Sequence, residues 1–166
     1  MVKMKYLVVA ASVILLAILA YVFLFQTEEK KVKKQFASLS HSVSKDPGET
    51  PFTLAQKMRR IGKLFSEKCE IRIPVETFSG SYTPEEITSL AARARIPFLE
   101  LHLQFYDLTV DFPEKRIANV VLTGKLSGKL SNGETVDETR ELECVLRKVE
   151  KGWVFNTVEV VEVLKK

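Results

Sequence analysis

The sequence is poor in the residues that build metal and redox centres. It contains two cysteines, Cys69 and Cys144, and two histidines, His41 and His102. The cysteines are far apart, so no Cys-x-x-Cys spacing exists, and neither histidine has a second histidine at a metal-ligand spacing. We therefore expect no metal and no cofactor, with His41 a solvated residue near a helix end. The cysteine pair fits two buried thiols as well as one disulfide.

One stretch lacks charge altogether. In residues 6–25, YLVVAASVILLAILAYVFLF, the only clearly polar residue is Ser12. A helix of that length, at about 1.5 Å per residue, spans the roughly 30 Å hydrocarbon core of a bilayer. No face of it is polar, which excludes a buried core helix. The run is longer than a signal-peptide h-region and no clean A-x-A site ends it, so an uncleaved anchor is favoured over a cleaved signal.

The charges around this run point in two directions. A count of basic residues near its ends places the C-terminal side inside the cell. A short basic tail, here with Lys3 and Lys5, is instead typical of a signal anchor that keeps its tail in the cytoplasm. We adopt the second interpretation: residues 1–26 are a cytoplasmic tail and a single-pass anchor in a bacterial inner membrane. Residues 27–166 are then a domain in the periplasm or outside the cell.

The basic excess lies next to the anchor. Residues 26–66 carry nine Lys or Arg against four acidic residues, whereas residues 67–166 carry fourteen against seventeen. The lysines that follow the anchor are predicted to rest on anionic headgroups; they are Lys30, Lys31, Lys33 and Lys34. No basic stripe interleaved with aromatic residues is present, so nucleic acid is not an expected partner. The segment GKLSGK has the wrong spacing for a phosphate loop, and its glycines mark a bend or close packing in a strand.

Three helices are predicted. Apolar residues recur at helical spacing over residues 28–43, and no Pro or Gly separates this stretch from the anchor, so one continuous helix is expected. Residues DPG at 46–48 end it. Thr50 caps a second helix whose apolar stripe extends to Phe65. The segment TPEE at 83–86 is a capping box that opens a short third helix, which Pro97 ends.

Strands are predicted over residues 69–74, 98–112, 116–130, 135–150 and 153–164. A three-residue turn at 150–152, with Gly152 left-handed, pairs Cys144 with Val158 and Leu142 with Val160. It also places Glu143 opposite Glu159. The pattern predicts an α+β domain, in which about three helices cover one face of an antiparallel sheet.

The strand FLELHLQFYDLTVDF at 98–112 changes phase midway. Apolar residues occupy one parity up to Phe105 and the other from Tyr106 onward, which indicates a β-bulge near that point. Because helices cover the apolar face, Glu100 and His102 are predicted to lie on the outer face. Asp107 and Asp111 are expected to turn outward at the bulge, unless it aims them into a cavity.

The element order over residues 28–166 and the C-terminal stretch RELECVLRKVEKGWVFNTVEVVEV resemble the nuclear transport factor 2-like superfamily, also called SnoaL-like or ketosteroid-isomerase-like. This resemblance implies a curved sheet wrapped around the helices into a cone, often with a pocket at its open end. Enzymes of this fold use a carboxylate or a His–Asp pair as general base. The candidate pocket residues are Tyr82, Tyr106, Asp107 and Asp111; none is assigned a catalytic role.

Two functions remain. The main hypothesis is a membrane-anchored, non-catalytic binding or assembly module, similar in layout to the single-anchor type IV secretion subunit that carries this fold. It predicts a homodimer or another protein partner on the outer sheet face. The alternative is a small-molecule-binding domain, or an isomerase- or dehydratase-type enzyme, with a pocket inside the cone.

Overall fold

The computed structural model describes residues 2–74 and 79–161, and it divides into two compact units at Lys31 and Val32. The first helix, α1, runs from Val2 to Val43 without a break, as its lack of Pro and Gly predicted. Its N-terminal part is long and apolar enough to cross a membrane. Large side chains there are exposed, including Val13 at 59% and Phe23 at 71%. These features are compatible with a membrane anchor.

The two short helices begin where their capping residues predicted. Helix α2 is Pro51–Gly62, and the Thr50 hydroxyl accepts a hydrogen bond from the Thr53 amide at 3.2 Å. Helix α3 is Pro84–Arg95. Its capping box is complete, since the Thr83 amide donates to Glu86 Oε2 at 2.8 Å and the Glu86 amide donates to the Thr83 hydroxyl at 3.3 Å.

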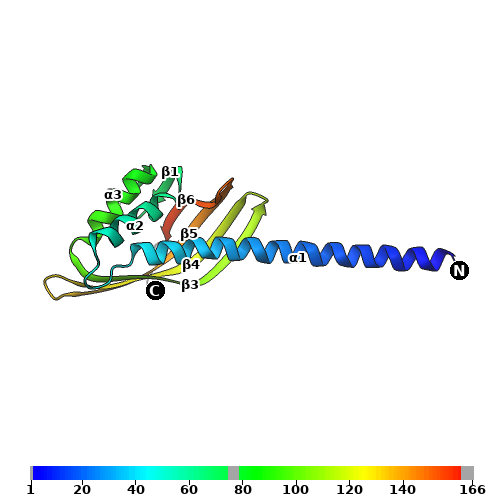
Figure 1. Cartoon of the computed structure of the whole chain (residues 1–166), viewed down its shortest axis with the longest axis horizontal. Helices are drawn as coiled ribbons and strands as arrows, with labels where there is room; N and C mark the ends of the chain where they lie inside the picture. The colour runs from blue at the N-terminus through cyan, green and yellow to red at the C-terminus, as the bar shows by residue number, and fades with distance from the viewer. Residues whose placement is uncertain (1, 75–78, 162–166) are drawn as a thin grey trace. The chain divides into compact units, whose positions relative to one another are not determined.

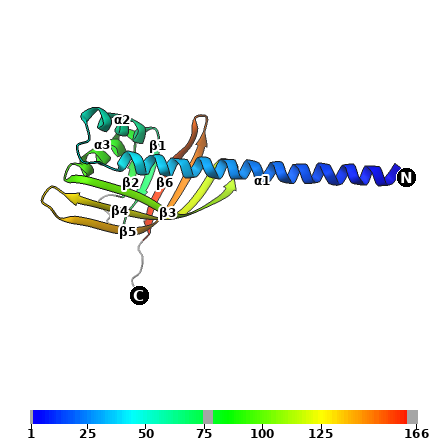
Figure 2. The ribbon, with the colours of Figure 1, turned by 60° about the horizontal axis from the view of Figure 1, so that its bottom comes forward.

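Six strands form one curved sheet in the order β2-β1-β6-β5-β4-β3 (Figure 1 and Figure 2). They are β1 (Phe65–Arg72), β2 (Gly80–Tyr82), β3 (Phe98–Glu114), β4 (Ile117–Leu130), β5 (Thr135–Val149) and β6 (Gly152–Val161). The fold class is α+β, as predicted.

Two details of the sheet correct the sequence prediction. Strand β1 pairs with β6 in parallel, so the sheet is mixed and not purely antiparallel. Phe65 begins this strand and does not end the apolar stripe of α2. Strand β2, which pairs antiparallel with β1, was not predicted. The parallel pairing joins β1 to a strand distant in sequence, so no turn between them predicts it.

The β5–β6 hairpin has the predicted register, but its turn differs from the predicted one. Cys144 pairs with Val158, and Glu143 lies opposite Glu159, as the sequence predicted. The predicted three-residue turn is wrong, because Val149 pairs with Gly152 and leaves a two-residue loop. A register shift between Val145 and Leu146 adds one residue on β6 and restores the predicted pairs.

The predicted bulge in β3 is confirmed. The register with β4 shifts between Tyr106 and Thr109, and Asp107 has a φ of 54°, a conformation uncommon for a residue with a side chain. The half-buried parity therefore passes from Phe105 to Leu108. Tyr106, which the sequence pattern grouped with the new apolar set, is exposed because the extra residue follows it.

Aromatic rings fill the space between the helices and the sheet. Phe36 of α1 contacts Phe155 with ring centroids 4.9 Å apart and Phe105 with centroids 5.5 Å apart. Phe65 packs on Phe155 from β1, with centroids at 5.3 Å. All three helices contribute buried residues to this core, which are Val32, Phe36, Met58, Ile61 and Ile87. Side chains from the helices and from the sheet therefore pack against one another inside the cone.

Candidate functional site

The last turns of α1 lie along the free edge of β3. Lys45 and Leu101 exchange backbone hydrogen bonds of 2.7 and 2.9 Å. The Ser40 hydroxyl donates to the Leu103 carbonyl, and the Leu103 amide donates to Ser44 Oγ at 3.1 Å. These contacts satisfy backbone groups that an edge strand would otherwise leave unpaired. They also hold α1 beside β3, and a groove lies between the two elements.

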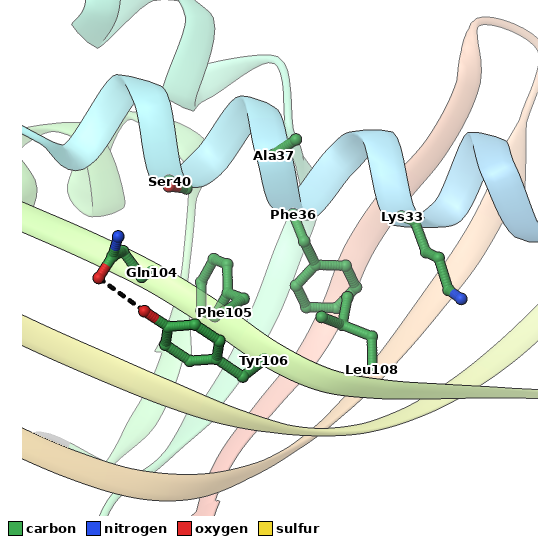
Figure 3. Close-up of a pocket in the computed structure, with 8 residues that line it drawn as sticks. All are labelled: Lys33, Phe36, Ala37, Ser40, Gln104, Phe105, Tyr106 and Leu108. Atoms are coloured by element: carbon green, nitrogen blue, oxygen red, sulfur yellow. Dashed lines mark hydrogen bonds between the residues drawn. The ribbon is translucent and has the colours of Figure 1, made fainter.

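One end of this groove is mainly apolar. It is a cavity of about 360 Å³ between α1 and β3 (Figure 3). Its lining residues are Lys33, Phe36, Ala37, Ser40, Gln104, Phe105, Tyr106 and Leu108. Figure 3 shows the rings of Phe36 and Phe105 next to each other on the side of α1 that faces β3, with Lys33 at the far end of the cavity. We call this part the apolar end.

Gln104 and Tyr106 form the rim of the apolar end on the strand side. The Tyr106 hydroxyl donates to Gln104 Oε1 at 2.8 Å, and Tyr106 is 44% exposed. Since this bond uses the amide oxygen, the amide NH₂ of Gln104 is the group left to donate. Figure 3 shows that nitrogen on the side facing α1. The Tyr106 side chain therefore orients a hydrogen-bond donor toward the groove.

The other end of the groove is polar. A second cavity, of about 350 Å³, shares Ala37, Ser40 and Gln104 with the first. Its remaining lining residues are His41, Ser44, Asp46, Lys57, His102 and Leu103. Both histidines of the chain thus line one cavity, which we call the polar end. Within the described residues, no cluster of three or more His, Cys, Asp or Glu side chains could hold a metal.

The sequence alone did not predict that the two histidines line the same cavity. His41 is on α1 and His102 is on β3, and the antiparallel bridge between Lys45 and Leu101 places the two elements side by side. No periodicity or spacing indicates that contact, because it joins the end of a helix to the edge of a sheet. The one available signal is the pair Ser40 and Ser44, four residues apart, because two such hydroxyl groups can form hydrogen bonds with the unpaired backbone groups of an edge strand.

A buried ion cluster lies beneath the polar end. Glu49 Oε1 is 2.7 Å from Lys57 Nζ, and Glu49 Oε2 is 2.7 Å from Arg95 Nη2. All three side chains are at most 5% exposed. Burial alone would raise the pKa of the Glu49 carboxyl, but hydrogen bonds from Lys57 and Arg95 and their charges lower it below its ordinary value. This cluster fixes Lys57 against α1, where its ammonium also donates to the Ser44 carbonyl at 2.8 Å.

The predicted pocket residues do not converge. Tyr106 lines the apolar end, whereas Tyr82 is half-buried and packs against the hydrophobic core. Asp107 and Asp111 are exposed and line neither end of the groove. The bulge therefore turns both carboxylates to solvent, which is the cheaper of the two outcomes considered for them.

The remaining predicted residues are mostly at the surface. His102 is exposed and lines the polar end, while Glu100 is half-buried. The four lysines predicted to face the membrane surface are exposed, and Lys33 among them lines the apolar end. No residue pattern in the sequence predicts a groove at this edge of the sheet.

The two cysteines are free, buried thiols, so the disulfide alternative is wrong. Burial, with a smaller effect of the Glu70 charge, raises the pKa of Cys69 to about 12. Burial, with a smaller effect of Cys69, raises that of Cys144 to about 12. Neutral thiols of this kind are poor nucleophiles, and they serve as small apolar groups in the core.

No protein-family model matches this sequence, and no curated protein matches it. Solved structures with a similar fold include the Kfla4162 protein from Kribbella flavida, with 10% identity, 82% of this chain and 90% of that chain covered, and a TM-score of 0.67. A protein from Novosphingobium aromaticivorans assigned as a scytalone dehydratase has 15% identity, 84% and 86% coverage and a TM-score of 0.66. The hexachlorocyclohexane dehydrochlorinase LinA-type3 from Novosphingobium barchaimii has 11% identity, 82% and 86% coverage and a TM-score of 0.66.

These likenesses cover most of the chain, and they concern its fold. The chain shares with these proteins an α+β fold in which a curved sheet wraps around helices, which is the fold that the resemblance in the sequence implied. At such identities the likeness defines the architecture, and the site must be argued from its own residues.

Proposed function

We propose that the domain is a non-catalytic binding module that holds a ligand or a partner segment in the groove between α1 and β3. The observation that carries this proposal is the composition of the apolar end. Among the described residues that line it, none is Asp, Glu, His or Cys. A substrate held in the apolar end would therefore meet no carboxylate or imidazole that could act as general base, because these groups line the polar end. It retains an apolar floor and a polar rim, as binding sites do.

The filled interior of the cone supports the same proposal. Phe36 and Phe155 occupy the space under the helices, and both are at most 2% exposed. A substrate pocket inside the cone would need that volume. A ligand can enter the surface groove at the β3 edge without displacing the core.

Enzyme activity is the second candidate, and two observations favour it. Structurally similar proteins include one assigned as a dehydratase and a dehydrochlorinase, so the fold comparisons support a catalytic function better than a purely structural one. The polar end also contains residue types that act as acids and bases, namely His41, His102 and Asp46.

A test of the binding proposal uses the full chain in phosphatidylcholine nanodiscs, labelled with 3-fluorotyrosine. The resonance of Tyr106 is assigned with the Tyr106→Phe variant, and neutral fragments such as cyclohexanol and benzyl alcohol are titrated. We expect a saturable shift of that resonance. Ala37→Trp fills the apolar end and weakens binding by about tenfold or more, which corresponds to about 1.4 kcal/mol.

The matched control is Ala55→Trp, the same substitution at an exposed position of α2 outside the groove. We expect it to leave the titration unchanged. A Tyr106 resonance that no fragment shifts, or equal losses in the two tryptophan variants, contradicts the proposal.

To test the second candidate, enzyme activity, the same protein is incubated with small hydroxylated and halogenated substrates. Turnover that His102→Gln abolishes would establish an enzyme.

A further inference from the structure

We infer that the groove binds a single-chain anionic amphiphile, with the alkyl chain in the apolar end and a carboxylate or phosphate head in the polar end. This inference rests on the proposed binding function and names its ligand class. It starts from the continuity of the groove, because the two cavities share Ala37, Ser40 and Gln104. Their lining changes from apolar to polar along one line, from Phe36 toward His41.

The shape of the groove selects a molecule with two unlike ends. Phe105 and Leu108 offer carbon surface at one end, which has Lys33 at its far end, and a head group held against these two side chains would lose water without gaining hydrogen-bond partners. Imidazole and amide groups lie at the other end, where an alkyl chain would bury donors. A compact apolar ligand would use the first end alone, and a small polar ligand the second. An extended amphiphile uses both.

The polar end favours a head that accepts hydrogen bonds. The Ser40 hydroxyl already donates to the Leu103 carbonyl, and the Ser44 hydroxyl to the Ser40 carbonyl at 2.8 Å. The donors that remain for a ligand are the His41 and His102 imidazoles and the Gln104 amide NH₂. A carboxylate or phosphate supplies the acceptors that this set requires.

The charges around the polar end also favour an anion. Lys57 lies beneath it and contacts Asp46 Oδ2 at 3.7 Å and Glu49 at 2.7 Å. The Glu49 charge is shared with Arg95 as well, so two cations face one buried carboxylate. Asp46, the one carboxylate that lines this end, is 72% exposed, and solvent screens its charge. A cationic head would instead be repelled by the buried ammonium of Lys57.

The position of the groove in the sequence supports a membrane source for the ligand. Lys33, at the apolar end, follows Phe25 by eight positions. A chain of that length reaches at most about 29 Å when fully extended. If residues 6–25 are inserted in a bilayer, the apolar end is therefore close to the membrane surface in any orientation of the domain. Single-chain amphiphiles exchange from that surface.

The experiment uses the full chain in phosphatidylcholine nanodiscs and three photoactivatable probes with a diazirine in the alkyl chain: palmitate, lysophosphatidate and hexadecanol. After irradiation, cross-linked peptides are mapped by mass spectrometry. We expect the anionic probes to label peptides that contain Phe36 or Phe105, and to do so at least tenfold more than hexadecanol. Ala37→Trp reduces this labelling about tenfold, and Ala55→Trp does not. Labelling by palmitate alone specifies a carboxylate head, and labelling by lysophosphatidate alone specifies a phosphate head.

The double variant His41→Ala, His102→Ala tests the head site separately, because it removes both imidazole donors. Both histidines are exposed, so the fold is retained, and the Tyr106 fragment shift verifies this. We expect anionic labelling to fall about tenfold, with hexadecanol labelling unchanged. Equal labelling by hexadecanol and palmitate, or no effect of the double variant, overturns the inference. If no amphiphile labels the groove while neutral fragments still shift Tyr106, the ligand class is wrong and the binding function stands. If both signals are absent, both proposals fail.

Discussion

At the scale of single residues, Glu49 links the groove to the rest of the domain. It is the one buried carboxylate in contact with both Lys57 and Arg95. We predict that Glu49→Gln lowers the free energy of unfolding by about 3–5 kcal/mol, because it leaves two buried cations without their counter-ion. Guanidinium denaturation of the full chain, followed by the fluorescence of the single, buried Trp153, measures this change.

Glu70→Gln is the matched control, since Glu70 pairs with Arg72 on the surface, where both side chains are more than half exposed. We expect this control to lower the free energy of unfolding by about 0–1 kcal/mol.

The lowered pKa of Glu49 also makes the stability of the domain depend on pH. The unfolded chain protonates this carboxyl near its ordinary value of 4.5, above the folded pKa, so the stabilisation is present above that pH and is lost as the pH falls below it. Parallel pH profiles for the wild type and Glu49→Gln would contradict the prediction.

At the scale of elements, the β3 bulge depends on one strained residue. Asp107 has a φ of 54°, which a β-branched side chain tolerates poorly. We predict that Asp107→Val lowers the free energy of unfolding by about 1–3 kcal/mol, and that Asp107→Gly does not lower it. Asp111→Val is the matched control on the same strand, with an expected effect within about 0.5 kcal/mol. Similar losses at both positions in chemical denaturation would mean that the bulge is not strained.

The elements show which parts of the fold local chemistry determines. The caps at Thr50 and Thr83 and the phase change in β3 follow from neighbouring residues, and all three are found in the structure. Strand β2 has three residues, too few to show a periodicity. The parallel β1–β6 pair and the approach of α1 to β3 join segments distant in sequence, so they depend on how the whole core packs. The groove arises from the contact between α1 and β3. Nothing in the sequence indicates that contact, so the predicted site lay inside the cone.

At the scale of the whole molecule, α1 contributes residues both to the core and to the groove. Val32 and Phe36 are buried in the core, and Phe36 also lines the apolar end of the groove, while Ala37 and His41 are exposed and line the groove. The same helix therefore closes the interior that a substrate would need and forms one wall of the surface site. A homodimer or another partner on the outer sheet face stays a prediction, and Val121, 53% exposed on β4, is a position where cross-linking can test it.

If residues 6–25 span a membrane, the direction of the chain across it decides which amphiphiles the groove can meet. We predict that alkaline phosphatase fused after Lys166 is active and that a green fluorescent protein fusion at the same place is dark, because the short basic tail stays in the cytoplasm and the domain is exported. We also predict that the membrane fraction contains the intact 18.8 kDa chain, since the apolar run is longer than a signal h-region. Fluorescence with an inactive phosphatase would place the domain in the cytoplasm and reverse the topology. A shorter, soluble product would show that residues 6–25 are a cleaved signal, and it would remove the membrane source from the argument for the ligand.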